Sequence, residues 1–267
     1  MRPHGLTPLS ELISLRGRRA LVTGAAAGIG SAVTHRLAEA GAALELVDID
    51  GDKLKAVADG LKDTGIEIHL HKTDVSSREE IDRLWASLGD RSVDLLINNA
   101  GIYPGRSFVK IDRDFYHKLM SSNMDSAFWM CQAMIRERWG RGGTIINIAS
   151  IEAILPFKDD LVPYSMSKAG VIALTRSLAK EYGRHDFRIN TLLPGGIITP
   201  GTKRVAQEIL HFKFDLIKTG VEFKQRLPIG RIGQPDEVAR MVLVLASDLA
   251  SYVHGAIIAV DGGFLSA

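Results

Sequence analysis

Short apolar runs and longer amphipathic segments alternate along this chain of 267 residues. Apolar runs of a few residues indicate strands, and apolar positions that recur every three or four residues indicate helices. On this basis we predict seven strands, within residues 19–24, 43–48, 66–72, 93–99, 143–150, 187–193 and 255–263. The third of these alternates apolar and polar positions, which is typical of a strand exposed on one face.

Helical patterns separate the strands, at residues 28–41, 51–63, 77–88, 112–139, 163–183, 202–220 and 235–247. Regular strand–helix alternation predicts an α/β fold, a doubly wound parallel sheet with helices on both faces. No linker-like stretch divides the pattern. We therefore expect a short N-terminal leader at residues 1–16 and a single domain at residues 17–267.

The composition is that of an ordinary globular protein, with 46% apolar and 24% charged residues and a net charge of +2. It gives no reason to expect a nucleic-acid or anionic membrane partner. No apolar run approaches the ~20 residues that span a bilayer, and the N-terminus lacks a signal-peptide pattern. The single cysteine, Cys131, lies in a helical pattern and is interpreted as a buried thiol rather than a catalytic one. These features predict a cytoplasmic protein.

The turn after the first strand is rich in glycine and reads T-G-A-A-A-G-I-G, residues 23–30. Gly24, Gly28 and Gly30 would let the backbone approach a pyrophosphate, and the following helix would point its positive end at that charge. Asp48 follows the second strand, 18 residues past Gly30, where an acidic residue can accept hydrogen bonds from ribose hydroxyls. The sequence therefore predicts dinucleotide binding at this edge.

Tyr164 and Lys168 lie four residues apart at the start of a predicted helix, and so on one face of it. An ammonium ~5 Å from the phenol oxygen would favour the phenolate by roughly 3 kcal/mol at an effective dielectric of ~20. This would lower the pKa of Tyr164 by about two units, toward the range useful for acid–base catalysis. Taken alone, this spacing occurs often by chance, and a half-buried tyrosine beside a solvated lysine is the favoured interpretation.

Further motifs show that residues 17–263 resemble the short-chain dehydrogenase/reductase family. The glycine-rich turn resembles the family's TGxxxGxG motif, N-N-A-G at residues 98–101 resembles the motif after its fourth strand, and P-G-G-I-I-T at residues 194–199 resembles its PGxIxT segment. The family's catalytic set is matched by Asn123, Ser150, Tyr164 and Lys168. The resemblance implies a Rossmann-like fold and a nicotinamide cofactor.

The resemblance also implies a role for each matched residue. Tyr164 would exchange a proton with the substrate oxygen, Ser150 would hydrogen-bond the same oxygen, and Lys168 would lower the pKa of Tyr164 and bind the nicotinamide ribose. Asn123 would hold a water that links Lys168 to solvent. The implied cofactor contacts are Gly24, Gly28, Ile29, Gly30, Asp48, Asp74, Val75, Asn99, Ala100, Gly101, Tyr164, Lys168, Pro194, Gly195, Ile197 and Thr199.

We expect the cofactor to be NAD rather than NADP. Asp48 would repel the 2′-phosphate of NADP, because like charges ~5 Å apart cost roughly 3 kcal/mol at an effective dielectric of ~20. Ala27 and Ile49 occupy positions where relatives that use NADP often carry a basic residue, and neither compensates that charge.

The expected substrate is a secondary alcohol or its ketone, and a sugar or polyol is the first choice. Glu152, two residues past Ser150, could accept hydrogen bonds from substrate hydroxyls and join Ser150 and Tyr164 in the substrate site. A 3-oxoacyl thioester and a steroid-like alcohol remain alternatives, and so does a catalytically silent relative that only binds the nucleotide. Ser150 and Tyr164 are 14 residues apart, one more than in many members of the family that the chain resembles, and the resemblance therefore implies a loop insertion between them.

Three further expectations concern the rest of the chain. Residues 200–227 carry one apolar stripe at helical spacing and are predicted to form a lid over the substrate. Apolar residues of the segments 112–139 and 163–183 (Phe115, Leu119, Trp129, Leu174 and Leu178) predict a homo-oligomer, and the resemblance favours a homotetramer. His69 and His71 alternate on one strand without further ligands, so we predict no catalytic metal.

Overall fold

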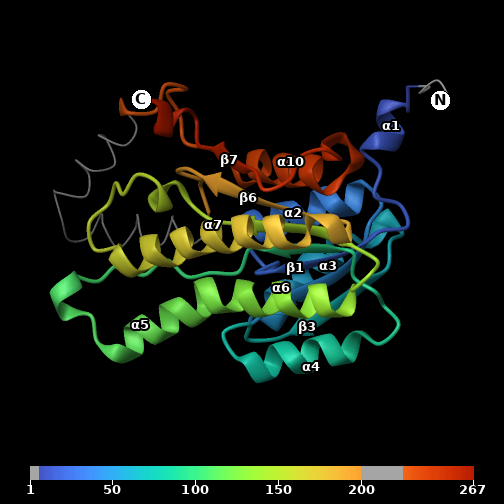
Figure 1. The fold of residues 1–267 in the computed structure, drawn as a ribbon, viewed down its shortest axis with the longest axis horizontal. Helices are drawn as coiled ribbons and strands as arrows, with labels where there is room; N and C mark the ends of the chain where they lie inside the picture. The colour runs from blue at the N-terminus through green and yellow to red at the C-terminus, as the bar shows by residue number, and fades with distance from the viewer. Residues whose placement is uncertain (1–5, 200–224) are drawn as a thin grey trace.

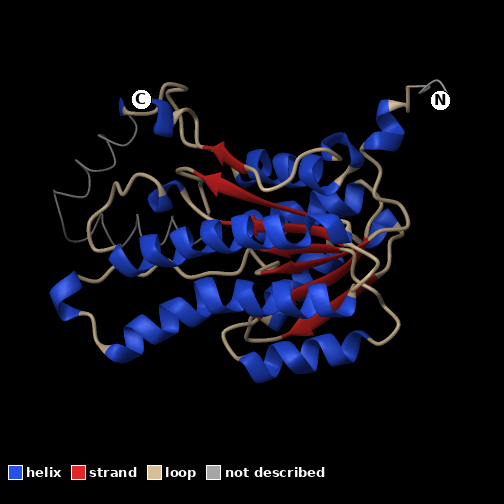
Figure 2. Ribbon diagram, viewed as in Figure 1, coloured by secondary structure: helices blue, strands red, loops and turns tan. Residues whose placement is uncertain are grey.

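The computed structural model describes residues 6–199 and 225–267. All seven predicted strands are present (Figures 1 and 2). They are β1 (Arg19–Thr23), β2 (Ala43–Asp48), β3 (Ile68–Lys72), β4 (Leu95–Asn98), β5 (Gly143–Ile148), β6 (Phe187–Pro194) and β7 (Ile257–Val260). They form one parallel sheet in the order β3-β2-β1-β4-β5-β6-β7, so the predicted doubly wound topology is confirmed.

Apart from one short helix in the predicted leader, the described helices lie where the periodicity predicted them, with small differences at their ends. They are α1 (Leu9–Leu12), α2 (Gly28–Glu39), α3 (Gly51–Asp59), α4 (Arg78–Leu88), α5 (Arg113–Met120), α6 (Ser126–Glu137), α7 (Val162–Tyr182) and α10 (Pro235–Ala246). The pattern at residues 112–139 is divided into α5 and α6 by a π-helical turn, Ser121–Asp125. The pattern at 202–220 lies outside the described residues.

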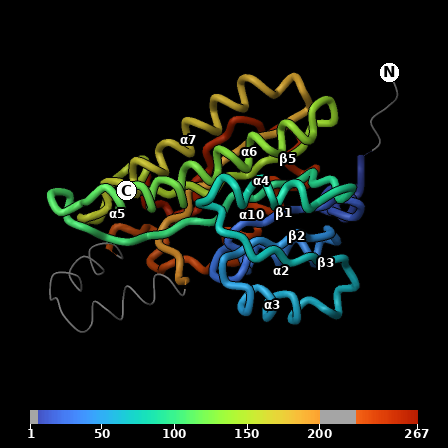
Figure 3. The backbone as a smooth tube through the Cα atoms, turned by 90° about the horizontal axis from the view of Figure 1, so that it is seen from below, coloured from blue at the N-terminus to red at the C-terminus, as the bar shows by residue number. Residues whose placement is uncertain are grey.

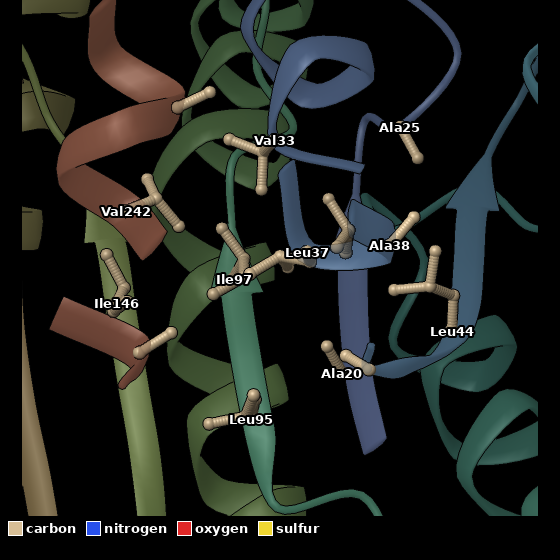
Figure 4. Close-up of a cluster of buried hydrophobic side chains, with 14 of the residues drawn as sticks. Ala20, Ala25, Val33, Leu37, Ala38, Leu44, Leu95, Ile97, Ile146 and Val242 are labelled. Carbon is tan, nitrogen blue, oxygen red and sulfur yellow. The ribbon is translucent and has the colours of Figure 1, made fainter. Parts of the chain in front are cut away.

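Helices lie on both faces of the sheet (Figure 3). An apolar layer holds the helices on each face. On one face, Val33 and Leu37 of α2 and Val242 of α10 pack on Ile97 and Ile146 of the central strands (Figure 4). On the other face, α4, α6 and α7 cover the same strands, and Cys131 is fully buried there. Burial raises the pKa of the Cys131 thiol to about 12, in agreement with its interpretation as a core residue.

The edges of the sheet differ from its centre. Strands β4 and β5 are almost entirely buried, which explains their continuous apolar runs. Strand β3 forms one edge, and Leu70 there is 41% exposed. The end of the predicted leader is packed against the domain, because Leu15 is fully buried and its N–H donates to the carbonyl of Ala40 at 2.8 Å.

Candidate active site

The glycine-rich turn runs from the end of β1 into α2 and brings backbone into close contact. Gly24 has a φ of +65° and Gly28 a φ of +57°, values that favour glycine. A Cβ at position 30 would lie 2.0 Å from the carbonyl oxygen of Gly24, so only a hydrogen fits there. The positive φ angles at Gly24 and Gly28 and the close contact at Gly30 therefore explain why these three positions hold glycine.

The first turn of α2 has no side-chain cap. Asp50, Ser77 and Asp112 accept backbone N–H groups at the starts of α3, α4 and α5, whereas Ala27 at the start of α2 has no side-chain acceptor. Uncapped N–H groups at the positive end of a helix can bind a phosphate. The turn therefore fits the pyrophosphate of a dinucleotide.

Thr23 joins this turn to the loop after β4. Its Oγ1 accepts hydrogen bonds from the backbone N–H groups of Asn99 and Ala100, both at 3.0 Å. The side-chain amide of Asn99 donates in return to the carbonyl oxygens of Thr23 and Gly24, at 3.0 and 3.1 Å. The sequence pattern assigned no role to Thr23. Its hydroxyl, directly before the first glycine, was the feature of the sequence that could have indicated this contact with the loop after β4.

Asp48 lies at the end of β2 beside the same turn. One carboxylate oxygen accepts from the N–H of Ala26 and the other from the N–H of Asp50, both at 3.0 Å. Its side chain is thus oriented by two backbone groups before any ligand binds. Ile49, the next residue, is 62% exposed and places no positive charge there.

The remaining predicted cofactor contacts follow other strands at the same edge. Asp74 and Val75 come after β3, and the Asp74 carboxylate accepts from the N–H and hydroxyl of Ser76 at 2.9 and 2.7 Å.

The predicted contacts at residues 194–199 follow β6. Pro194 ends this strand, and the N–H of Gly195 donates to the carbonyl of Val260 at 3.0 Å. Ile197 is buried and pairs with Gly233, and Thr199 is half-buried at the limit of the described segment.

Asn123 lies in the π-helical turn between α5 and α6 and is buried. Its side chain accepts from the N–H of Ile102 at 2.7 Å and donates to the carbonyl of Ile102 at 2.9 Å. A Cβ on Gly101 would lie 3.2 Å from Asn123 Oδ1 and 3.5 Å from Lys168 Nζ. The structure therefore brings Gly101, Asn123 and Lys168 together. Wide helical turns of this kind are frequent at functional sites.

Tyr164 and Lys168 lie in the first turns of α7, with Pro163 in the first turn of the helix. The Lys168 ammonium is 5.9 Å from the Tyr164 ring centroid and donates to the carbonyl of Ile148, at the end of β5, at 2.9 Å. Ser150 follows the same strand and hydrogen-bonds Tyr164. The structure thus joins Ser150, after β5, to Tyr164 of α7, and it places Asn123 of the π turn near Lys168 of the same helix.

The sequence predicted that Lys168 lowers the pKa of Tyr164, but the net pKa of Tyr164 in the structure is raised. Burial raises the pKa of Tyr164 to about 12, while the hydrogen bond from Ser150 opposes this and the charge of Glu152 adds to it. Burial also lowers the pKa of Lys168 to about 8. The difference arises because the ammonium is directed at Ile148, and because removal from water disfavours both charged forms.

Glu152 is only 6% exposed and does not turn to solvent. Its carboxylate accepts from the N–H of Phe157 at 3.1 Å and from the N–H of Lys158. Burial raises the pKa of Glu152, and these two hydrogen bonds oppose the rise. Glu152 thus organises the loop between Ser150 and Tyr164 as well as bordering the site.

Tyr103 is a site residue that the sequence analysis missed. Its ring meets the Tyr164 ring edge to face, with the centroids 4.7 Å apart. Burial and the nearby charge of Glu152 raise the pKa of Tyr103 above its ordinary value. A tyrosine two residues past N-N-A-G was visible in the sequence, but no pattern connected it with Tyr164.

Comparison with known proteins gives one consistent answer. Residues 24–265 match a family model described as "Enoyl-(Acyl carrier protein) reductase". The chain is 36% identical to gluconate 5-dehydrogenase of Gluconobacter oxydans, covering 95% of this chain and 96% of that protein. It is 35% identical to 3-oxoacyl-[acyl-carrier-protein] reductase FabG of Aquifex aeolicus, covering 94% and 98%.

Solved structures agree with this result. Gluconate 5-dehydrogenase from Burkholderia cenocepacia J2315, in complex with NADP and tartrate, superposes with a TM-score of 0.87 at 32% identity and covers 97% of this chain and 100% of that one. The chain belongs to the short-chain dehydrogenase/reductase family, and it is an oxidoreductase of that family.

Two further observations concern membranes and metals. No helix in the described ranges is long and apolar enough to cross a membrane. Within those ranges there is also no group of three or more His, Cys, Asp or Glu side chains that could hold a metal ion. His71 instead contacts Glu45 at 2.6 Å, and His69 contacts Glu67 at 2.6 Å.

Proposed function

We propose that this protein is an NAD-dependent dehydrogenase that interconverts a secondary alcohol and its ketone, with a sugar or polyol as substrate. The observation that carries the proposal is the contact of Ser150 with Tyr164, in a buried site that also holds Lys168 and Asn123. A protein that only binds a nucleotide has no physical need for this set of groups.

The residues of the chain would divide the proton transfer as follows. The Tyr164 phenolate takes the hydroxyl proton during oxidation, and the Tyr164 phenol gives a proton to the substrate oxygen during reduction. The Ser150 hydroxyl donates to the substrate oxygen and stabilises the charge that develops there. Lys168, whose pKa is about 8, is the group through which the proton passes onward past Gly101 and Asn123.

The residues fit a dinucleotide at the edge described above. The uncapped N–H groups of α2 would bind the pyrophosphate, Asp48 the adenosine ribose, and Lys168 the nicotinamide ribose. The segment from Pro194 to Thr199 would lie beside the nicotinamide ring. When bound, the cofactor supplies the hydride acceptor or donor.

Asp48 is the basis for proposing NAD over NADP. Both carboxylate oxygens are already fixed by backbone N–H groups, so this charge cannot easily turn away from a 2′-phosphate. The similar structure of gluconate 5-dehydrogenase is a complex with NADP, and that observation is about the cofactor of that protein. The proposal for this chain rests on its own Asp48 and on the uncharged Ile49 beside it.

The substrate class is proposed from the polar groups around Tyr164. Glu152 and Tyr103 lie close to Tyr164, and Lys158 lies over the Tyr103 ring, so charged and hydroxyl groups are available near Tyr164 for a hydroxyl-rich substrate. Similarity to a gluconate 5-dehydrogenase supports this choice. A 3-oxoacyl thioester is the second candidate, since the FabG relatives act on that class by name and Phe157 is an apolar neighbour of the site.

We also propose a cytoplasmic homotetramer with a substrate lid. Leu119 and Leu174, two of the residues that suggested an oligomer, are buried within the protomer and so do not support it. Tyr116, Phe128, Val162 and Met166 instead expose between 36% and 50% of their surface on the same helices. The proposed lid lies almost wholly outside the described residues, apart from its last three positions.

The test is absorbance at 340 nm with NAD or NADP and a panel of alcohols. The panel contains alditols, aldonates, a 3-hydroxyacyl thioester and a hydroxysteroid. We expect turnover of a polyol or sugar acid with NAD. Turnover of the thioester alone would support the second candidate, and no turnover despite NAD binding would indicate a silent relative.

A further inference from the structure

The loop between Ser150 and Tyr164 is held by one buried carboxylate. Glu152 accepts the N–H groups of Phe157 and Lys158, and the carbonyl of Asp160 accepts from the N–H of Arg106 at 2.9 Å. The Phe157 ring packs edge to face on Phe264, with the centroids 5.4 Å apart. These contacts fix the backbone from which the Lys158 side chain projects.

The half-buried Lys158 side chain places its ammonium over the ring of Tyr103. Its ammonium lies 5.3 Å from the centroid of the Tyr103 ring. That ring in turn meets Tyr164 edge to face. One aromatic ring therefore separates a positive charge from the proposed proton carrier.

Lys158 forms no salt bridge in the part of the chain that the structure describes, and its ammonium contacts the ring of Tyr103. Glu152 attracts Lys158 electrostatically, but its carboxylate is already hydrogen-bonded to two backbone N–H groups. An ammonium held in a half-buried site keeps donors for an incoming anion.

We propose that the substrate is a hydroxy acid whose carboxylate is bound by Lys158 while its alcohol carbon reacts at Tyr164. Tyr103 forms the wall between the two ends, and Glu152 is a positioning residue that sets the loop from which Lys158 extends. The proposal rests on the dehydrogenase function given above and narrows its substrate from sugars and polyols in general to sugar acids.

The separation of Lys158 from Tyr164 favours a short hydroxy acid over other anions. The Tyr103 ring centroid lies 5.3 Å from the Lys158 ammonium and 4.7 Å from the Tyr164 ring centroid, so the separation is comparable with the length of a short sugar-acid chain. The phosphate of an acyl-carrier or coenzyme thioester lies at the far end of a long pantetheine arm, well beyond Lys158. A neutral polyol would leave the ammonium without a new partner, so it would gain less from this residue.

The first experiment measures binding, so that it does not depend on turnover. Thermal unfolding of the full-length protein with saturating NADH is followed with added gluconate or with glucitol, the uncharged alditol of the same chain length. We expect gluconate to raise the Tm more than glucitol does. Lys158→Met should remove this difference, Lys158→Arg should retain most of it, and Lys180→Met, on the exposed far end of α7, should not change it.

The second experiment compares kcat/KM for gluconate and glucitol. Lys158→Met should lower the gluconate-to-glucitol ratio by about tenfold or more, as expected for loss of one charged hydrogen-bond partner. Glu152→Gln should raise KM for gluconate more than it lowers kcat, because it loosens the loop without removing Tyr164. Acetoacetyl-CoA serves as the thioester probe.

The outcomes separate the two proposals. Equal stabilisation by gluconate and glucitol, or a ratio unchanged by Lys158→Met, would overturn the carboxylate site. A larger effect of Lys158→Met on acetoacetyl-CoA than on gluconate would also overturn it. Lysine-dependent stabilisation by gluconate without turnover of any alcohol would instead contradict the dehydrogenase function and leave the carboxylate site standing.

Discussion

The glycine-rich turn at residues 23–30 and the loop at residues 151–163 lie at the same edge of the sheet but are built differently. Backbone geometry determines the first: positive φ angles, a glycine that admits no Cβ and uncapped N–H groups. Side chains determine the second, mainly the buried carboxylate of Glu152. A site formed by backbone groups binds the pyrophosphate that dinucleotides share. A loop that is fixed by side chains can differ in sequence and conformation between relatives.

The first way to test this comparison is Tyr164→Phe, at the point where the two regions meet. The ring can still pack against Tyr103, but the proton carrier is lost, so kcat should fall by roughly 10³-fold. NAD affinity and thermal stability should stay close to those of the parent. Steady-state kinetics and NAD titration measure the two effects, and kcat within tenfold of the parent would refute the assignment.

The second test is Asp48→Asn in the cofactor region. Removing the negative charge while retaining one acceptor for the neighbouring N–H groups should raise the NADP-to-NAD ratio of kcat/KM by about 100-fold, which corresponds to ~3 kcal/mol. Asp52→Asn, an exposed aspartate in the first turn of α3, is the control. A parent enzyme that already prefers NADP would contradict the role given to Asp48.

The third test asks whether the turn depends on backbone contact. Gly30→Ala would place a methyl group against the carbonyl of Gly24, so we expect a loss of ~1–3 kcal/mol or more in unfolding free energy and weaker NAD binding. Gly51→Ala is the matched control, because its Cβ would meet only Lys72 at an ordinary 3.4 Å. Urea unfolding that shows equal stability for the two variants would argue against the close approach.

The smallest effect concerns pH and the buried Lys168. Its pKa is about 8 in the folded protein and ~10.4 in an unfolded chain, so between these values the unfolded state binds more protons and stability rises with pH. The slope is at most ~1.4 kcal/mol per pH unit for one proton. Lys168→Met should lack this rise, and should therefore exceed the parent in stability most clearly near pH 7.

Urea unfolding without cofactor at pH 7.5 and pH 9.5 measures this difference. The upper value stays below pH 10, because the raised pKa of Tyr164 makes stability fall with pH between about 10 and 12. Lys180→Met, an exposed lysine on α7, should follow the parent at both values. Parallel behaviour of Lys168→Met and the parent would show that the lysine does not change its charge in this range.

The sequence predicted the strands and the glycine-rich turn well and the contacts of the loop at residues 151–163 poorly, for a physical reason. Strands and glycine turns follow from local residue patterns, and all seven strands and the turn at Gly24 lie where the patterns put them. The roles of Tyr103 and Glu152 depend on contacts between segments distant in the chain. Periodicity carries no information about such contacts.

The pKa directions at Tyr164 and Lys168 show the same limit. Spacing on a helix correctly placed the two residues on one face. Spacing could not show that burial would disfavour both charged forms, or that the ammonium would donate to Ile148. Burial is the largest cause of both pKa shifts, and burial depends on the complete fold.

Because Ser121–Asp125 form a π-helical turn, the position of Asn123 depends on the number of residues in this segment. An α-helix turns about 100° per residue, and a π turn accommodates one residue more than an α turn. Loss of a single residue here would let the helix continue regularly from α5 into α6 and would rotate Asn123 away from Ile102. Insertion or deletion of one residue in this segment would therefore damage the site more than most substitutions in the same helix, even though it barely changes the composition.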